Sequence, residues 1–127
     1  MSIYKGNKLI AGGSNKPNKP DRPDWAKAVL LDRVRVYMNG YTAPSNGMIV
    51  GWFTFSNHIA VLGLKVNSIT VARASITGSS TNSEGNVQCP VNKGDLIKLE
   101  NLQGSIGLND IDAALYFVPF IDGYTGN

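Results

Sequence analysis

From Trp25 to the end of the chain, short apolar runs alternate with clusters of Gly, Asn, Ser, Asp and Pro. Apolar runs of this length are typical of β-strands, and the clusters between them are typical of tight turns. No long segment repeats its apolar residues at the helical period, although 25–31 could form one turn. Seven or eight short strands in a chain of 127 residues predict an all-β fold, an antiparallel β-sandwich or jelly roll.

The expected strands are assigned from their apolar pattern. Apolar residues alternate in 32–38, so that they would share one face of a strand. The run 48–55 is apolar at nearly every position, which predicts a strand covered on both faces. Asn67-Ser68 is a candidate two-residue hairpin turn. The expected strands are 32–38, 48–55, 59–66, 69–74, 87–91, 96–100 and 113–120.

The first 24 residues differ in character from the rest of the chain. Three prolines, Pro17, Pro20 and Pro23, recur within 14–24 and favour an extended, semi-rigid linker. The apolar run 9–11 precedes this linker and is too small to fold without a partner surface. We therefore expect two parts: an N-terminal attachment arm with a Pro-rich linker over residues 1–24, and a β-sandwich head domain over residues 25–127.

The formal net charge of +3 belongs to the N-terminal arm. Residues 1–24 contain five basic and two acidic residues, whereas residues 25–127 contain seven of each. A domain that binds nucleic acid would carry the basic patch itself, so we expect no nucleic-acid partner. No apolar run is long enough to cross a membrane, and the run after Lys5 and Lys8 is too short for a signal peptide. We therefore expect neither membrane insertion nor export.

Residues that commonly carry enzyme chemistry are scarce. Cys89 is the only cysteine and His58 the only histidine, which excludes a disulfide within the chain and a multi-cysteine metal site. Cys89 alternates with two valines, which predicts a buried, inert thiol, and His58 is expected in a turn. The Asn/Asp cluster at 109–112 lacks the further ligands of a calcium loop and is typical of a turn. We expect no enzyme activity, no cofactor and no bound metal.

Two sets of residues are candidates for contact with other molecules. The longest polar stretch, 77–86, would be a surface loop whose amides and hydroxyls can bond sugar hydroxyls. Aromatic residues occupy both faces of two expected strands, so that one face must meet a second surface, a subunit or a sugar ring. The receptor-contact candidates are Thr81, Asn82, Ser83 and Asn86, and the oligomer-interface candidates are Trp52, Tyr116, Phe117 and Phe120.

Short motifs are spread over residues 3–120 of the chain. They are Ile3-Tyr-Lys-Gly-Asn-Lys-Leu-Ile-Ala-Gly12, Tyr41-Thr-Ala-Pro-Ser-Asn-Gly47, Leu64-Lys-Val-Asn67, Pro90-Val-Asn-Lys-Gly-Asp95 and Tyr116-Phe-Val-Pro-Phe120. In this order they resemble motifs of bacteriophage tail-fibre receptor-binding head domains and related small virion proteins. The chain departs from the family pattern at Ser68, where glycine is usual, and after Phe120.

The resemblance implies a jelly-roll head similar to tumour-necrosis-factor and fibre-knob domains, assembled as a homotrimer. It implies a bacterial surface glycan or envelope protein as receptor, and another virion structural protein bound through residues 1–24. We therefore expect a non-enzymatic phage virion protein, made in the host cytoplasm, whose trimeric fibre head recognises the host surface. Two alternatives stay open: an architectural decoration protein without receptor contact, and a carbohydrate-binding module.

Overall fold

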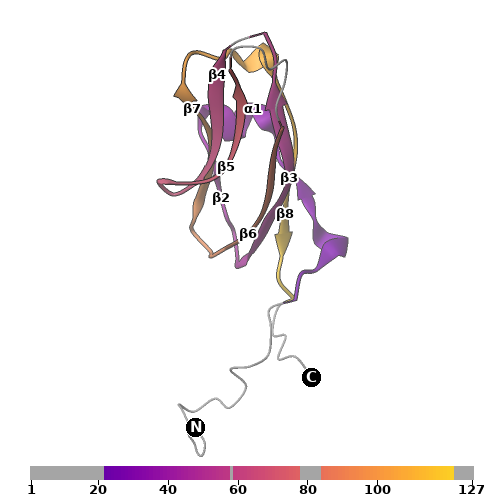
Figure 1. Ribbon diagram of the computed structural model, residues 1–127. Coiled ribbons are helices and arrows are strands. Elements are labelled where there is room, and N and C mark those ends of the chain that lie inside the picture. Colours follow the sequence, from indigo (N-terminus) through magenta and orange to yellow (C-terminus); the bar gives the residue numbers. More distant parts are fainter. Residues whose placement is uncertain (1–21, 58, 78–83, 122–127) are drawn as a thin grey trace, which may run out of the picture.

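The computed structural model describes residues 22–57, 59–77 and 84–121. Eight strands within these ranges form two four-stranded antiparallel sheets that pack face to face (Figure 1). The prediction of an all-β sandwich is therefore confirmed. The first sheet contains, in order, β1 (Val29–Leu30), β8 (Ile111–Pro119), β3 (Gly47–Phe55) and β6 (Glu84–Val91), and the second contains β2 (Tyr41–Thr42), β7 (Leu96–Gln103), β4 (Ala60–Val66) and β5 (Ile69–Ile76).

The core lies between the two sheets and is filled by alternate residues of the long strands. Phe53 of β3 is completely buried, and its cross-strand neighbour in β6 is Gly85. A Cβ atom at Gly85 would come within 2.4 Å of the Phe53 ring, so a side chain is excluded there. The other large buried side chains are Phe55, Phe117, Ile49, Leu62, Leu64, Ile97, Leu99, Ile106, Ile111, Leu115 and Val36.

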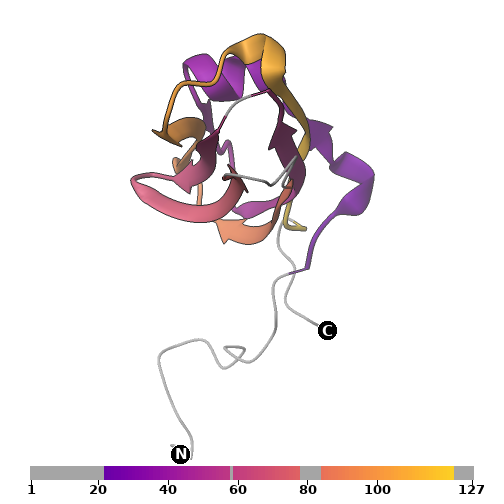
Figure 2. The same ribbon diagram turned by 45° about the horizontal axis from the view of Figure 1, so that its top comes forward.

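The segment expected as a strand over 32–38 is a helix, and that prediction is wrong. Helix α1 (Arg33–Met38) begins where the Asp32 side chain accepts a hydrogen bond of 3.0 Å from the Val34 N–H. The chain must pass here from β1 in one sheet to β2 in the other, and α1 spans this gap at one side of the sandwich (Figure 2). Val36 is the buried residue of the helix, and the Tyr37 hydroxyl donates a 2.7 Å hydrogen bond to the Ile106 carbonyl.

The turns at the end of the sandwich next to the chain termini are joined by hydrogen bonds. The predicted hairpin turn is confirmed, because Asn67 joins β4 to β5 with a positive φ of 58°. The Asn67 side chain accepts a hydrogen bond from the Leu96 N–H and donates one to Asp95. Gly94, with a φ of 92°, lies in the tight turn before β7. Hydrogen bonds thus connect the β4–β5 turn to the start of β7 at this end of the sandwich.

Both described ends of the chain lie at that same end of the sandwich (Figure 1). The Asp24 N–H donates to the Pro119 carbonyl and the Ile121 N–H donates to the Arg22 carbonyl, each over 2.8 Å. Pro23 also forms a bridge with Phe120. Residues 22–24, which were expected in the linker, thus pair with the residues at the end of β8 and just after it. A short 3₁₀ helix, η1 (Trp25–Lys27), follows at the position of the expected helical turn.

At the opposite end, which we call the distal end, β3 and β5 finish and β6 and β8 begin. The Asn/Asp cluster at 109–112 lies here. It forms the end of the second 3₁₀ helix, η2 (Leu108–Asp110), and the first residues of β8. This is the turn role expected for the cluster.

Candidate functional site

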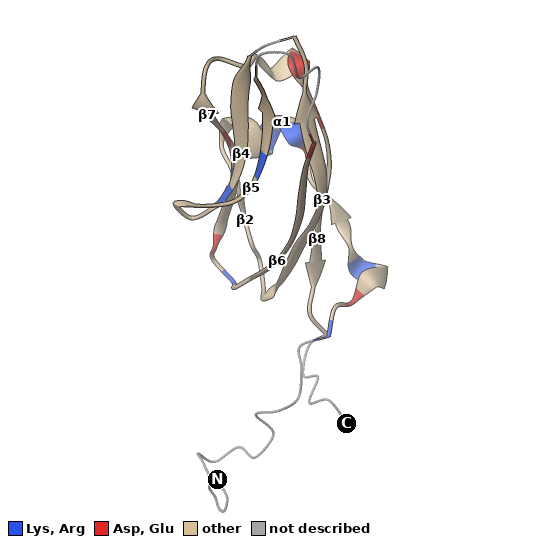
Figure 3. Cartoon of the chain, in the orientation of Figure 1, with Lys and Arg blue, Asp and Glu red and all other residues tan. Residues whose placement is uncertain are grey.

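The two outer faces of the sandwich differ in charge (Figure 3). The strands of the β2-β7-β4-β5 sheet carry basic side chains and one acidic partner, including an ion pair of 3.1 Å between Lys65 and Glu100. The strands of the β1-β8-β3-β6 sheet carry no basic residue, and their two acidic residues lie near the distal end. The charged strand residues are Lys65, Arg73, Lys98 and Glu100 in one sheet, and Glu84 and Asp112 in the other.

The β1-β8-β3-β6 sheet, whose strands carry no basic residue, presents an apolar outer surface beside η1. Trp25 is 58 % exposed, Leu30 60 % and Tyr116 38 %. A hollow of about 260 Å³ opens between η1, β3 and β8 on this side. Its lining contains no charged residue. We call this surface the apolar face and define it by Trp25, Ala28, Leu30, Val50, Tyr116 and Val118.

The side chains of the apolar face do not belong to the core. Val118 is fully buried and yet lies outside the core cluster, in the wall of the hollow beside Trp25 and Ala28. Leu30 lies opposite Tyr116, and Tyr116 lies opposite Val50, so these side chains form a row across three strands. The sequence did not lead us to expect residues 25–30 on this outer surface. Their apolar composition was the available signal, but it predicted only a helical turn.

The next row toward the distal end contains Trp52, with Ala114 opposite it in β8 and Asn86 opposite it in β6. Asn86 was expected in the loop 77–86, and that placement is wrong because β6 already begins at Glu84. Gly85 and Val87 are buried on the inner face, which turns Asn86 outward. The polar composition of the segment concealed this alternation. The structure thus brings one receptor-contact candidate beside one interface candidate.

The four aromatic interface candidates lie in three different places. Trp52, half-buried, and Tyr116 lie on the outer face of the β1-β8-β3-β6 sheet. Phe117 is only 2 % exposed, because its side chain points to the core, where its ring centroid lies 5.9 Å from that of Tyr41. Phe117 therefore has no surface to offer another subunit, and its assignment to the interface is corrected. Phe120, half-buried, lies at the end of β8.

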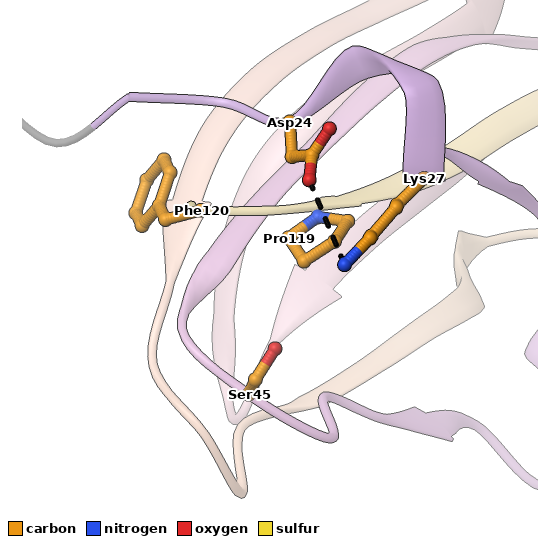
Figure 4. A pocket seen from close by; sticks show the side chains of 5 residues that line it. All are labelled: Asp24, Lys27, Ser45, Pro119 and Phe120. Carbon is orange, nitrogen blue, oxygen red and sulfur yellow. Dashed lines mark ion pairs between the residues drawn. The ribbon is translucent and has the colours of Figure 1, made fainter. Parts of the chain in front are cut away.

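Phe120 lines a second, smaller hollow where the chain enters the domain (Figure 4). The hollow measures about 100 Å³ and also contains Asp24, Lys27, Ser45 and Pro119. Asp24 and Lys27 form an ion pair of 3.9 Å in which the Lys27 side chain is largely exposed. A solvent-exposed pair at this distance contributes little to stability. We assign no chemistry to this hollow.

The other receptor-contact candidates, Thr81, Asn82 and Ser83, lie outside the described residues, as does His58. The residues on either side of that stretch, Thr77 and Glu84, lie at the distal end, opposite the entry of the chain (Figure 1).

The reactive side chains that the structure describes are few. Cys89 is half-buried, and burial, followed by the charge of Asp95, raises the pKa of its thiol. A raised pKa lowers the thiolate fraction at neutral pH, so this thiol is a poor nucleophile. Within residues 22–57, 59–77 and 84–121, no three His, Cys, Asp or Glu side chains gather to hold a metal ion. No helix in these ranges has the length and apolar character needed to cross a membrane.

Comparisons of the chain with protein-family models, with curated proteins and with solved structures found no match. The function must therefore be inferred from the surfaces of the molecule itself.

Proposed function

We propose that the chain is a non-enzymatic virion protein of a bacteriophage, the head domain of a homotrimeric fibre that recognises the bacterial surface. The observation that carries this proposal is the apolar face. Contiguous apolar and aromatic surfaces are uncommon on monomers, and subunit contacts typically bury them. Within it, Leu30 is 60 % exposed and Tyr116 38 % exposed in the single chain. A second copy of the chain would remove both from water.

We further propose that the sandwich is a jelly roll. In that topology, an eight-stranded antiparallel chain folds so that the first strand pairs with the eighth, the second with the seventh, and so on inward. The pairs β1–β8, β2–β7, β3–β6 and β4–β5 are all hydrogen-bonded neighbours here. The two sheets are completed by the pairs β3–β8 and β4–β7. This strand order supports the architecture implied by the resemblance to fibre heads.

The arrangement of the two ends supports a role in attachment. The described chain begins at Arg22, paired with the residues at the end of β8, and residues 1–21 precede it in the sequence. We propose that residues 1–24 bind another virion protein at this end. The distal end then points away from the particle, and we propose that Thr81, Asn82 and Ser83 contact the host there. Their hydroxyl and amide groups suit a glycan or a polar protein surface.

This assignment is tested by the binding of the fluorescently labelled full chain to whole bacteria from a panel of species. We expect binding to at least one species, and we expect the triple variant Thr81→Ala, Asn82→Ala, Ser83→Ala to lose it. Lys93→Ala, in an exposed turn at the opposite end, is the matched control and should bind as the unaltered chain does. Binding to no species would contradict host recognition, and unchanged binding of the triple variant would contradict the assignment of the loop.

A further inference from the structure

Trp52 lies at the distal border of the apolar face, next to two exposed amide side chains. In the β3–β6 pair, Trp52 is opposite Asn86 and Val50 is opposite Gln88. Side chains opposite each other in an antiparallel pair have Cβ atoms about 5 Å apart, so the Asn86 amide lies beside the indole. Gln88 is the diagonal neighbour of Trp52, about 7 to 8 Å away, a separation that a long side chain can span. Asn86 and Gln88 are exposed, and their amides form no hydrogen bond within the described part of the chain.

On its other side, the half-buried Trp52 has a small neighbour. Its neighbour in β8 is Ala114, whose methyl group is too small to cover the indole ring. Trp52 is also not part of the hollow that Trp25, Tyr116 and Val118 surround. The indole is therefore bordered by a methyl group on one side and by two amides on the other. This differs from the purely apolar surroundings of Tyr116.

An aromatic ring beside amides suits one class of ligand in particular. The C–H face of a sugar ring packs on an indole, and amides supply both donors and acceptors for neighbouring hydroxyl groups. Charge restricts the choice further. The strands of this sheet carry no Lys or Arg, and Glu84 and Asp112 lie in the next rows toward the distal end. The strands therefore offer an anionic sugar no cationic side chain, and an uncharged sugar suits this surface better.

We propose that Trp52, Asn86 and Gln88 bind one ring of a neutral saccharide, with the indole as the stacking platform and the amides as hydrogen-bond partners. The inference rests on the proposed host recognition and names its ligand class. It also assigns Trp52 to ligand binding rather than to the subunit contact, which then lies over Tyr116 and the hollow. The saccharide site borders that contact at the distal end.

The chain contains only two tryptophans, which makes Trp52 a direct reporter. In the full-length Trp25→Phe variant, all indole fluorescence comes from Trp52. We expect a saturable change in that fluorescence on titration with at least one of maltohexaose, cellohexaose, chitohexaose and mannohexaose, and none with heparin. In the reciprocal Trp52→Phe variant, Trp25 reports, and its emission should not change.

The amides are tested in the Trp25→Phe background. Asn86→Ala and Gln88→Ala should each weaken saccharide binding about tenfold, which corresponds to the loss of one hydrogen bond of about 1.4 kcal/mol. Gln103→Ala, an exposed amide at the end of β7 in the other sheet, is the matched control and should not weaken it. Equal affinities of all these variants would overturn the role of the amides.

Two further results would overturn the site. One is unchanged Trp52 fluorescence with every neutral saccharide in the series. The other is a fall in solution mass on Trp52→Ala, because Trp52 would then lie in the subunit contact. The outcomes also separate this inference from the proposed function. Saccharide binding by a chain that attaches to no bacterium supports the site and contradicts host recognition, whereas attachment without any saccharide response contradicts the site alone.

Discussion

At the scale of single residues, Phe53 and Gly85 show how alternation fixes the inner face, because the ring occupies the space that a Cβ at Gly85 would need. Alternation predicts which neighbours point in opposite directions, and it correctly separates Tyr116 from Phe117. It does not tell which of the two faces the second sheet covers. For this reason the sequence could not decide that Phe117 is buried and that Tyr116 is exposed.

Asn67 is the residue whose replacement tests the turn between β4 and β5. Its φ of 58° strains most residues other than Gly, Asn and Asp, and its side chain accepts a 3.0 Å hydrogen bond from the Leu96 N–H. We expect Asn67→Ala to lower the free energy of unfolding by about 1–2 kcal/mol. Asn67→Gly should cost less, because glycine accepts the positive φ and loses only the side-chain bonds.

Urea denaturation of the two variants measures this difference. Equal losses for Ala and Gly would show that the backbone conformation of the turn contributes nothing. No loss in either variant would show that the hydrogen bonds to Leu96 and Asp95 contribute nothing as well.

At the scale of elements, the sequence predicts strands better than it predicts helix α1. The runs that form β3, β4 and β7 are recognised because short segments rich in apolar residues are best buried as strands of a sheet. In 32–38, an apolar residue at every second position fits a strand, whereas in the helix only Val36 is buried and Val34 and Met38 are exposed. The segment forms a helix because it connects the two sheets and because Asp32 caps its first turn. The connection is a property of the whole fold and cannot be recognised in the segment alone.

The capping bond of Asp32 gives a direct test of this explanation. We expect Asp32→Ala to lower the free energy of unfolding by about 1 kcal/mol, because the Val34 N–H loses its acceptor. Asp32→Asn keeps an acceptor oxygen at the same position and should stay close to the unaltered chain. Thermal unfolding followed by circular dichroism compares the three proteins. Equal stability of Asp32→Ala and Asp32→Asn would contradict the capping role.

At the scale of the whole molecule, the apolar face and the charged opposite face divide the sandwich into two unlike sides. The aromatic residues on both faces of two expected strands predicted that one outer face is covered, and Tyr116 was among the interface candidates. It could not locate Trp25 and Leu30 beside Tyr116, because their proximity depends on the pairing of β1 with β8 across the length of the chain. The position of Asn86 beside Trp52 could not be predicted either, because it depends on the pairing of β6 with β3.

A single measurement tests the central claim, that the apolar face is a contact between copies of this chain. It is the solution mass of the full chain by light scattering coupled to size exclusion, beside two variants that each place a lysine on an exposed apolar residue. Tyr116→Lys alters the apolar face, whereas Ile69→Lys alters a 68 % exposed residue of the other sheet.

We expect three times the chain mass of 13.6 kDa for the unaltered protein and for Ile69→Lys. Tyr116→Lys should give the mass of one chain with an unchanged circular dichroism spectrum, because a charge in the contact opposes association. A single-chain mass for the unaltered protein, or a trimer of Tyr116→Lys, would contradict the account.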